Sequence, residues 1–347
     1  MPRDIHYFKK DDGTELPVSD DFLLPYLSPT SKGTHFRESA PAGDINERQQ
    51  GRVLLQIHQI LHLLQEYGID LTDKVMLDVG TGDGLIPCLM LELSELKSAV
   101  GSDPYLDGEH ATSWQPHDHN KAFQDVVGFL RKYCPGKICF ESYRHLVGYE
   151  NYSLRPGNVH CREQPEKQYR FEQIGAHDLE KIGQRFDFLY CKAIEHIHDW
   201  DGVFRSFSAA TVEGGVAYLK HRSFFSYLGP HRYSSINIPW GHLLLTDQEY
   251  ERFVDERFGD QAEKIKKFYF EGLSYPRQTV SDMIETASRH NLVPVAVITE
   301  PTRFVDKVYR YTREIKGFWK IVRENFPGVA TDEVFSGMHH ILLRRIG

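Results

Sequence analysis

Hydrophobic and polar residues alternate along most of this chain with one of two periods. From residue 43 to residue 69, apolar side chains recur every three or four positions, which is the spacing of one face of a helix. Asp44 and Glu47 stand three residues apart at its start, as in a capping box, and Gly68 suits its end. This region therefore predicts a long helix with one buried face.

Short apolar runs follow this helix and alternate with further helical patterns. The runs that predict strands are KVMLDV, SAVGSD, YRFEQI, FDFLYC and GVAYLK, and later VPVAVIT and HHILLRR. The helical patterns cover residues 85–96, 120–134, 200–211, 279–291 and 306–324. Strands that alternate with helices imply a parallel sheet with helices on both faces. The sequence thus predicts a doubly wound, mostly parallel α/β fold.

Two regions interrupt this alternation. Residues 1–43 are rich in Pro, Gly, Ser and charged residues, and they predict an N-terminal extension that could act as a lid. Residues 221–278 are dense in His, Arg and aromatic residues, and they predict an insert that binds a substrate. The predicted core then covers residues 44–220, which would bind a cofactor, and resumes over residues 279–347.

Composition and charge narrow the classes of partner. The formal net charge of the 347 residues is −8, which argues against binding to nucleic acid or to an anionic membrane. No apolar run approaches the roughly 18 residues of a membrane span, and the first residues do not resemble a secretory signal. The five cysteines lack paired spacing, which predicts reduced thiols. We therefore expect a cytoplasmic protein without a membrane partner, and a homodimer is left open.

The stretch LDVGTGDGLIP, residues 77–87, contains the first candidate chemistry. Its three glycines follow an apolar strand, where they let the backbone approach a ligand closely. The GxGxG spacing differs from the GxGxxG of dinucleotide binders, and a plain strand-to-helix turn is the alternative. Asp103 ends the next predicted strand, where a carboxylate can accept hydrogen bonds from both hydroxyls of a ribose. The two features together predict a nucleoside site.

Several motifs in succession then resemble one known family. LDVGTGDG, AVGSD, IGAHDLEKI, FDFLYCKAIEHIHDW and VEGGVAYLK resemble, in this order, the motifs of class I S-adenosylmethionine-dependent methyltransferases. The resemblance covers about residues 45–220 and returns over residues 279–347. It implies a seven-stranded sheet with an antiparallel last strand, and S-adenosyl-L-methionine as the cofactor. Residues 1–43 and 221–278 do not match the common core, so the resemblance indicates the methyl donor and leaves the acceptor open.

The resemblance also implies which residues bind the cofactor. By position, Asp78 and Gly80 would hold its methionine end, Asp103 its ribose, and Asp178 its adenine amino group. A helix N-cap is an equal alternative for Asp178. The full implied set is Asp78, Gly80, Thr81, Gly82, Gly84, Asp103, Asp178 and Cys191.

The catalytic residues are predicted from position and chemistry. Methyl transfer to a hydroxyl or to a protonated amine needs a base, and histidine suits this role near neutral pH. His196 and His221 follow adjacent predicted strands, so both would emerge at the same edge of a parallel sheet. Paired cysteines and the HExxH motif are absent from the sequence, so we expect no metal site.

The insert supplies the candidate substrate-binding residues. Aromatic side chains can enclose a small acceptor, and arginine suits a carboxylate or a phosphate. The alternative is packing and hydrogen bonding within an irregular loop. The candidates are Arg222, His231, Arg232, Tyr233, Trp240 and His242.

The sequence therefore predicts an enzyme that transfers a methyl group to a small polar metabolite. We favour O-methylation of a sugar or a carboxylic acid, and N- or S-methylation of a small metabolite is the alternative. A non-catalytic partner protein on the same fold is the alternative from another class. The GxGxG spacing disfavours a nicotinamide oxidoreductase, and the acidic charge balance disfavours a nucleic-acid methyltransferase.

Overall fold

The computed structural model describes residues 5–22, 47–82, 84–104, 169–272, 277–302 and 305–347. The chain divides into two compact units, which are described separately. Unit 1 comprises Met1–Glu38, Ala193–Asp201 and Leu219–Leu342, and unit 2 comprises Ser39–Lys192, Gly202–Tyr218 and Leu343–Gly347. The domain boundaries expected from the sequence stay predictions.

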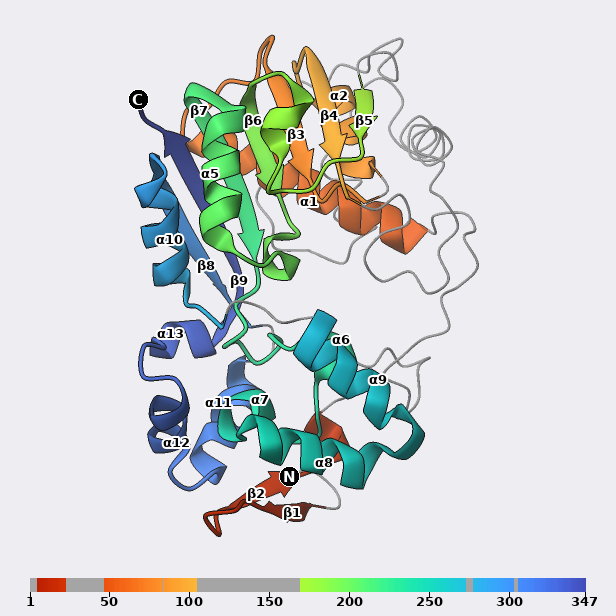
Figure 1. Cartoon of the computed structure of the whole chain (residues 1–347), viewed down its shortest axis with the longest axis vertical. Helices are drawn as coiled ribbons and strands as arrows, with labels where there is room; N and C mark the ends of the chain where they lie inside the picture. The colour runs from red at the N-terminus through yellow and green to blue at the C-terminus, as the bar shows by residue number, and fades with distance from the viewer. Residues whose placement is uncertain (1–4, 23–46, 83, 105–168, 273–276, 303–304) are drawn as a thin grey trace. The chain divides into compact units, whose positions relative to one another are not determined.

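A seven-stranded sheet contains every strand expected from the sequence (Figure 1). Its order is β5-β4-β3-β6-β7-β9-β8, and β3 pairs in parallel with both β4 and β6. The antiparallel pairing lies at the β9–β8 end. This topology confirms the predicted doubly wound α/β fold. The strands are β3 (Val75–Val79), β4 (Ser98–Ser102), β5 (Tyr169–Glu172), β6 (Phe186–Cys191), β7 (Thr211–His221), β8 (Leu292–Pro301) and β9 (Ser336–Arg345).

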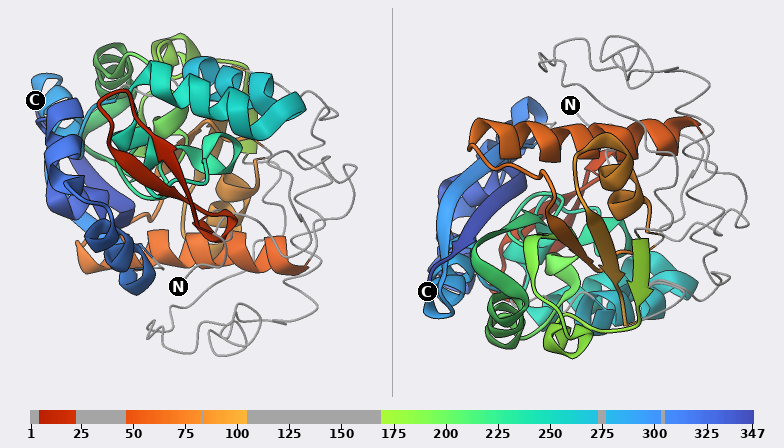
Figure 2. Two further views of the ribbon diagram at one scale, coloured as in Figure 1. Left: turned by 90° about the horizontal axis from the view of Figure 1, so that it is seen from below. Right: turned by 90° about the horizontal axis from the view of Figure 1, so that it is seen from above.

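Helices cover both faces of the strands in unit 2 (Figure 2). On one face lie α1 (Glu47–Glu66) and α2 (Leu85–Leu93), and on the other lies α5 (Trp200–Ala210). These three helices lie where the apolar periodicity predicts them, because each has one stripe that the sheet can bury. The helix predicted over residues 120–134 falls outside the described residues.

Unit 1 contains the helix α10 (Val280–Arg289), whose start the sequence indicates clearly. Thr279 Oγ1 accepts a hydrogen bond from the Asp282 amide at 3.1 Å, and the Asp282 carboxylate accepts one from the Thr279 amide at 2.8 Å. This reciprocal pair is a capping box and fixes the first turn.

The single helix predicted over residues 306–324 is wrong. The structure has two helices there, α11 (Val305–Glu314) and α12 (Phe318–Asn325). Gly317 separates them with φ of 75°, a left-handed conformation that glycine adopts without steric cost. A short helix, α13 (Thr331–Val334), then precedes β9.

Residues 221–272 form a helical region with an aromatic core. Phe224, Trp240 and Tyr250 are all buried there, and they pack with Phe318 of α12 in one hydrophobic cluster. The aromatic residues of the insert thus act first as core residues. The elements are α6 (His231–Ser234), α7 (Gly241–Leu244), α8 (Asp247–Phe258), α9 (Ala262–Lys267) and a π-helix at Phe268–Gly272.

The start of the chain belongs to the same core. Strands β1 (His6–Lys9) and β2 (Glu15–Val18) form an antiparallel hairpin. Lys10 Nζ lies 3.6 Å from Glu249 Oε2 of α8 and donates a hydrogen bond to the Leu244 carbonyl at 2.7 Å. The ion pair is almost entirely buried, so the hairpin is anchored to the helical region. The part of the predicted extension over residues 23–43 lies outside the described residues.

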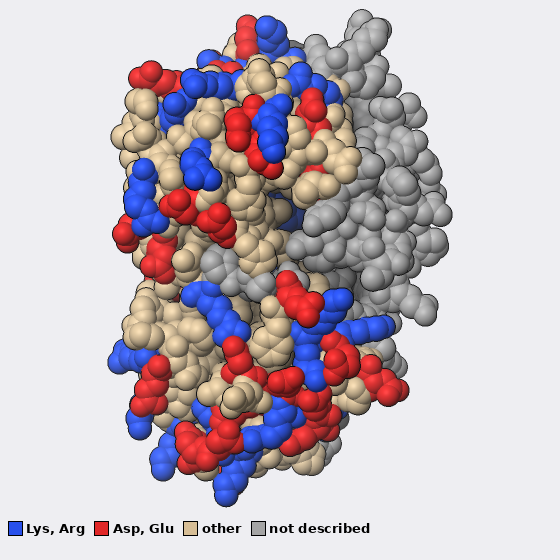
Figure 3. Space-filling model, viewed as in Figure 1, with Lys and Arg blue, Asp and Glu red and all other residues tan. Residues whose placement is uncertain are grey.

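Charged side chains of both signs are interspersed on the face drawn in Figure 3. Among the helices that the structure describes, none is long and apolar enough to cross a membrane.

Candidate active site

The ends of three adjacent strands are level at one edge of the sheet in unit 2. Val79 of β3 pairs in parallel register with Ser102 of β4 and with Cys191 of β6. In a doubly wound sheet, ligands bind beyond this carboxyl edge. The glycine loop, residues 80–84, follows Val79 directly, so the structure places it at the edge where a ligand is expected.

The loop backbone needs its glycines. Gly80, Gly82 and Gly84 have φ of 71°, 56° and 71°, which is the left-handed region that other residues rarely adopt. The amides of Gly80 and Thr81 donate hydrogen bonds to the Ser102 carbonyl, at 2.8 and 3.1 Å. The loop is therefore attached to the end of β4 and turns sharply into α2.

Asp78 is a buried carboxylate beneath this loop. Its side chain is in the core of unit 2, and its Oδ2 accepts a hydrogen bond from Thr81 Oγ1 at 2.8 Å. A Cβ added to Gly101 would lie 2.5 Å from the Tyr169 hydroxyl oxygen and 2.8 Å from Thr81 Cγ2. Gly101 therefore leaves space over the sheet for both the Thr81 and the Tyr169 side chains. Sequence reasoning missed Gly101, although a glycine inside a strand is a known signal of close approach.

Asp103 is joined to the same loop. Its carboxylate Oδ2 accepts a hydrogen bond from the Gly82 amide at 3.1 Å, and its own amide donates to the Glu172 carbonyl at 3.2 Å. The structure thus brings Asp78, Thr81, Gly82 and Asp103 together at one edge, as the motif spacing predicts.

Asp178 lies between β5 and β6 of unit 2, and Cys191 is the last residue of β6. Asp178 precedes a 3-10 turn, Leu179–Ile182, and forms an ion pair of 2.8 Å with Lys181 Nζ. Asp178 occupies the N-cap position of this turn, although its side chain makes no capping hydrogen bond there. Cys191 ends β6 and is buried. The adenine and donor-pocket roles of these two residues stay predictions.

His221 ends β7 in unit 1 and is 2% exposed. Its ring centroid lies 5.7 Å from that of Trp200 and 6.1 Å from that of His339. Neither ring nitrogen has a hydrogen-bond partner among the described residues. Burial, with the nearby charge of His339 second, lowers the pKa of His221 to about 3. The imidazole is therefore neutral at physiological pH, and a base that titrates near neutrality does not match this environment.

His196 lies in the short 3-10 helix Ile194–His196 that follows β6. Its ring centroid is 6.2 Å from that of His231. Although several histidines gather in unit 1, no group of three or more His, Cys, Asp or Glu in the described parts of the chain could hold a metal ion.

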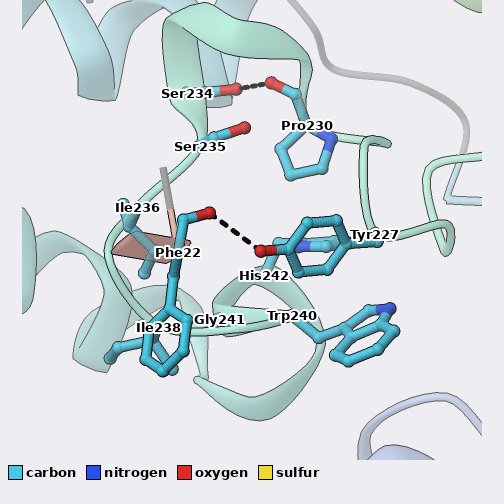
Figure 4. A pocket seen from close by; sticks show the side chains of 10 residues that line it. All are labelled: Phe22, Tyr227, Pro230, Ser234, Ser235, Ile236, Ile238, Trp240, Gly241 and His242. Atoms are coloured by element: carbon cyan, nitrogen blue, oxygen red, sulfur yellow. Dashed lines mark hydrogen bonds between the residues drawn. The ribbon is translucent and has the colours of Figure 1, made fainter. Parts of the chain in front are cut away.

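Two of the predicted substrate-binding residues, Trp240 and His242, line one small pocket in unit 1 (Figure 4). Tyr227 closes one side, and its hydroxyl donates a hydrogen bond to the Phe22 carbonyl at 2.8 Å. Phe22 was missed in the sequence because its role depends on contacts far along the chain.

His242 is buried against Phe224, with ring centroids 5.2 Å apart. Burial lowers the pKa of His242 to about 3, although the carbonyls of Phe224 and Ser226 oppose this shift through hydrogen bonds. The Nε2 atom has no hydrogen-bond partner in the described part of the chain, so it can accept one from a ligand.

The structure describes the side chains of only two of the other four predicted substrate-binding residues. Arg222 and His231 do not line this pocket. Arg232 and Tyr233 belong to α6, and their side chains lie outside the description. The structure therefore gathers only part of the predicted set.

Comparison with known proteins gives the class of this chain. The model of the methyltransferase domain family matches residues 47–259. This span includes the glycine loop, Asp103, β6 and most of the insert. The chain belongs to the methyltransferase domain family, and the predicted class I methyltransferase is confirmed.

Solved structures similar to this chain have low sequence identity to it. A candidate sarcosine dimethylglycine methyltransferase from Galdieria sulphuraria is 12% identical, with 84% of this chain and 86% of that chain covered and a TM-score of 0.43. A mycolic acid cyclopropane synthase in complex with SAH and CTAB is 14% identical, with 94% of each chain covered and a TM-score of 0.42. An S-adenosylmethionine dependent methyltransferase from Mesorhizobium loti is 12% identical, with 82% and 96% covered and a TM-score of 0.39. A search of curated protein sequences found no match.

Proposed function

We propose that this methyltransferase transfers the methyl group of S-adenosyl-L-methionine to an oxygen atom of a small polar metabolite, of the sugar or carboxylic acid class. The binding of the methyl donor is supported by one observation: two carboxylates are hydrogen-bonded to the glycine loop. Asp78 lies beneath the loop and Asp103 beside it, and each is joined to it by a hydrogen bond.

The donor-binding residues fit this cofactor. A Cβ placed on Gly82 would meet no atom of the described residues within 4 Å, so none of them fills the space that it faces. Asp103 stands where a carboxylate can accept hydrogen bonds from ribose hydroxyls. Asp78 would hold the amino group of the methionine end by charge. The cofactor supplies an already activated sulfonium methyl, so alignment with the acceptor provides much of the acceleration.

The proposed base and the proposed acceptor-binding residues lie in unit 1. His196 is the favoured base, because burial makes His221 a weak one at neutral pH. Trp240 and His242 would contact the acceptor through the pocket in unit 1. The sugar or carboxylic acid class rests on the His and Arg content of the insert, and the cytoplasmic location stays a prediction.

Two measurements test this function. Calorimetry with S-adenosylhomocysteine (SAH) should show one-to-one binding, and tight binding of NAD in its place would reject the proposal. A screen of metabolites with labelled S-adenosylmethionine should then give a methylated product. Label on nitrogen or sulfur would correct the acceptor atom, and SAH binding without any labelled product would favour a non-catalytic partner protein.

A further inference from the structure

The side chain of Gln56, on α1, contacts the end of β6. Its amide nitrogen donates a hydrogen bond to the Tyr190 hydroxyl oxygen. Its amide oxygen accepts one from Lys192 Nζ at 3.2 Å. Gln56 is 7% exposed, and the buried apolar residues Ile57 and Ile60 follow it in the helix. A buried amide with both ends engaged has a fixed orientation, because turning it over would leave a donor facing a donor.

The two partners of this amide come from the end of β6 and from the residue after it. Tyr190 belongs to β6, whose last residue is Cys191, and Lys192 follows the strand directly. A single amide that contacts both residues therefore links α1 to the end of β6, which is the part of the strand level with the glycine loop.

Tyr190 is also the residue next to Asp78 on the neighbouring strand. Asp78 pairs in parallel register with Tyr190 on β6 and with Gly101 on β4. Residues in parallel register point to the same face, so Tyr190 lies along one side of Asp78. Burial raises the pKa of Tyr190 most, and the nearby Tyr218 and the Asp78 charge raise it further, so the phenol stays protonated beside the carboxylate.

On the other side of Asp78, toward β4, the neighbouring residues are also known. Thr81 and the Tyr169 hydroxyl share the space over Gly101, and the Thr81 hydroxyl donates to Asp78 Oδ2. The carboxylate thus lies between Thr81, from the glycine loop, and Tyr190, which Gln56 holds. The loop motif accounts for the first of these contacts, and nothing in the motif accounts for the second.

We infer that Gln56 and Tyr190 are positioning residues for the amino-acid end of the methyl donor. The inference rests on the proposed function, in which Asp78 binds that end. Gln56 orients the Tyr190 phenol, and the phenol restricts the Asp78 carboxylate to the orientation that faces the donor. Helix α1 therefore contributes to donor affinity through Asp78, and only for ligands that carry the amino-acid group.

Two ligands separate positioning from general stability. SAH carries the amino-acid end, whereas 5′-methylthioadenosine keeps the adenosine and the sulfur but lacks that end. Gln56→Met and Tyr190→Phe remove the polar groups at nearly constant volume. Each should weaken SAH binding by roughly three- to tenfold in calorimetry, as expected when one hydrogen bond is lost. The affinity for 5′-methylthioadenosine should not change, and its binding also reports that the variant is folded.

A matched control lies on the same helix. Gln65 is exposed, so Gln65→Met repeats the chemical change away from the site and should leave both affinities unchanged. Equal losses for the two ligands, or an unchanged SAH affinity in both variants, would overturn the inference. A wild-type protein that does not bind SAH would reject the proposed function itself, which is a different result.

Discussion

The donor edge of unit 2 and the helical region of unit 1 use their polar residues in different ways. At the donor edge, Asp78 and Asp103 are tied to one short loop by hydrogen bonds of 2.8 and 3.1 Å. In the helical region, His221 and His242 are enclosed by aromatic rings, and each has a ring nitrogen without a partner in the described residues.

The two sites also differ in how far apart in the sequence their contacting residues lie. The contacts of the donor edge join residues close along the chain or on neighbouring strands, so a motif can specify them. The pocket of unit 1 joins residues separated by about two hundred positions, such as Phe22 and Tyr227. Contacts of that kind depend on packing, which allows the acceptor to change while the donor edge is kept.

The largest expected effect concerns His196, the proposed base in unit 1. His196→Ala should lower the rate by roughly 10²- to 10⁴-fold if His196 takes the acceptor's proton. SAH affinity should not change, because the donor contacts lie in unit 2. The wild-type rate should rise with pH through an ionisation near neutrality, and this rise should disappear in the variant. Steady-state rates between pH 5 and 9 would measure it.

His221→Ala is the informative comparison for this prediction. Because burial keeps His221 neutral, its replacement should lower the rate without removing the rise with pH. If both variants keep normal turnover, the acceptor needs no base, as for a thioether or an already ionised group. The two histidines would then have structural or orienting roles.

The second prediction concerns the aromatic core of the insert. Trp240 is buried, and its indole nitrogen donates to the Val334 carbonyl at 3.3 Å. Trp240→Ala should lower the free energy of unfolding by about 3–5 kcal/mol through cavity formation. Urea denaturation would measure this, with Tyr309→Ala as the control, because Tyr309 is 50% exposed. Equal stability of wild type and Trp240→Ala would contradict the packing described for unit 1.

Most features whose causes are local in the chain could be predicted from the sequence, whereas features that depend on distant contacts could not. The strands and helices of the sheet follow from apolar periodicity, since each must bury one face. The loop geometry follows from three glycines that adopt positive φ. The hairpin β1–β2 was missed because its reason is tertiary, a buried Lys10–Glu249 pair. The break at Gly317 has a local reason, one left-handed glycine inside a helical pattern, which the apolar periodicity does not register. Gln56 looked like an ordinary polar interruption of an apolar helix.

The third prediction concerns Glu333 of α13 and the effect of pH on stability. Glu333 Oε1 accepts hydrogen bonds from Ser223 Oγ at 2.6 Å and from the Val280 amide at 3.1 Å. Burial nevertheless raises the pKa of this carboxyl from 4.5 to about 7. The folded state therefore holds the proton more tightly than the unfolded state between these two values.

Stability should consequently fall as pH rises from about 4.5 to about 7, and this contribution should level off above that range. The loss is on the order of 3 kcal/mol. Glu333→Gln keeps the carbonyl acceptor and removes the ionisation, so its unfolding curves should lack this part of the pH dependence. Identical pH profiles for wild type and Glu333→Gln would show that the carboxyl does not titrate as described.

The smallest expected effect returns to the donor edge. Asp103→Ala leaves the Gly82 amide without its carboxylate partner and removes the proposed acceptor of the ribose hydroxyls. SAH binding should weaken by roughly 1–3 kcal/mol, the usual cost when a hydrogen-bonding group is left unpaired. Calorimetry should give the same loss for 5′-methylthioadenosine, because both ligands carry the ribose. A loss for SAH alone would mean that Asp103 acts on the amino-acid end, and the ribose assignment would then be wrong.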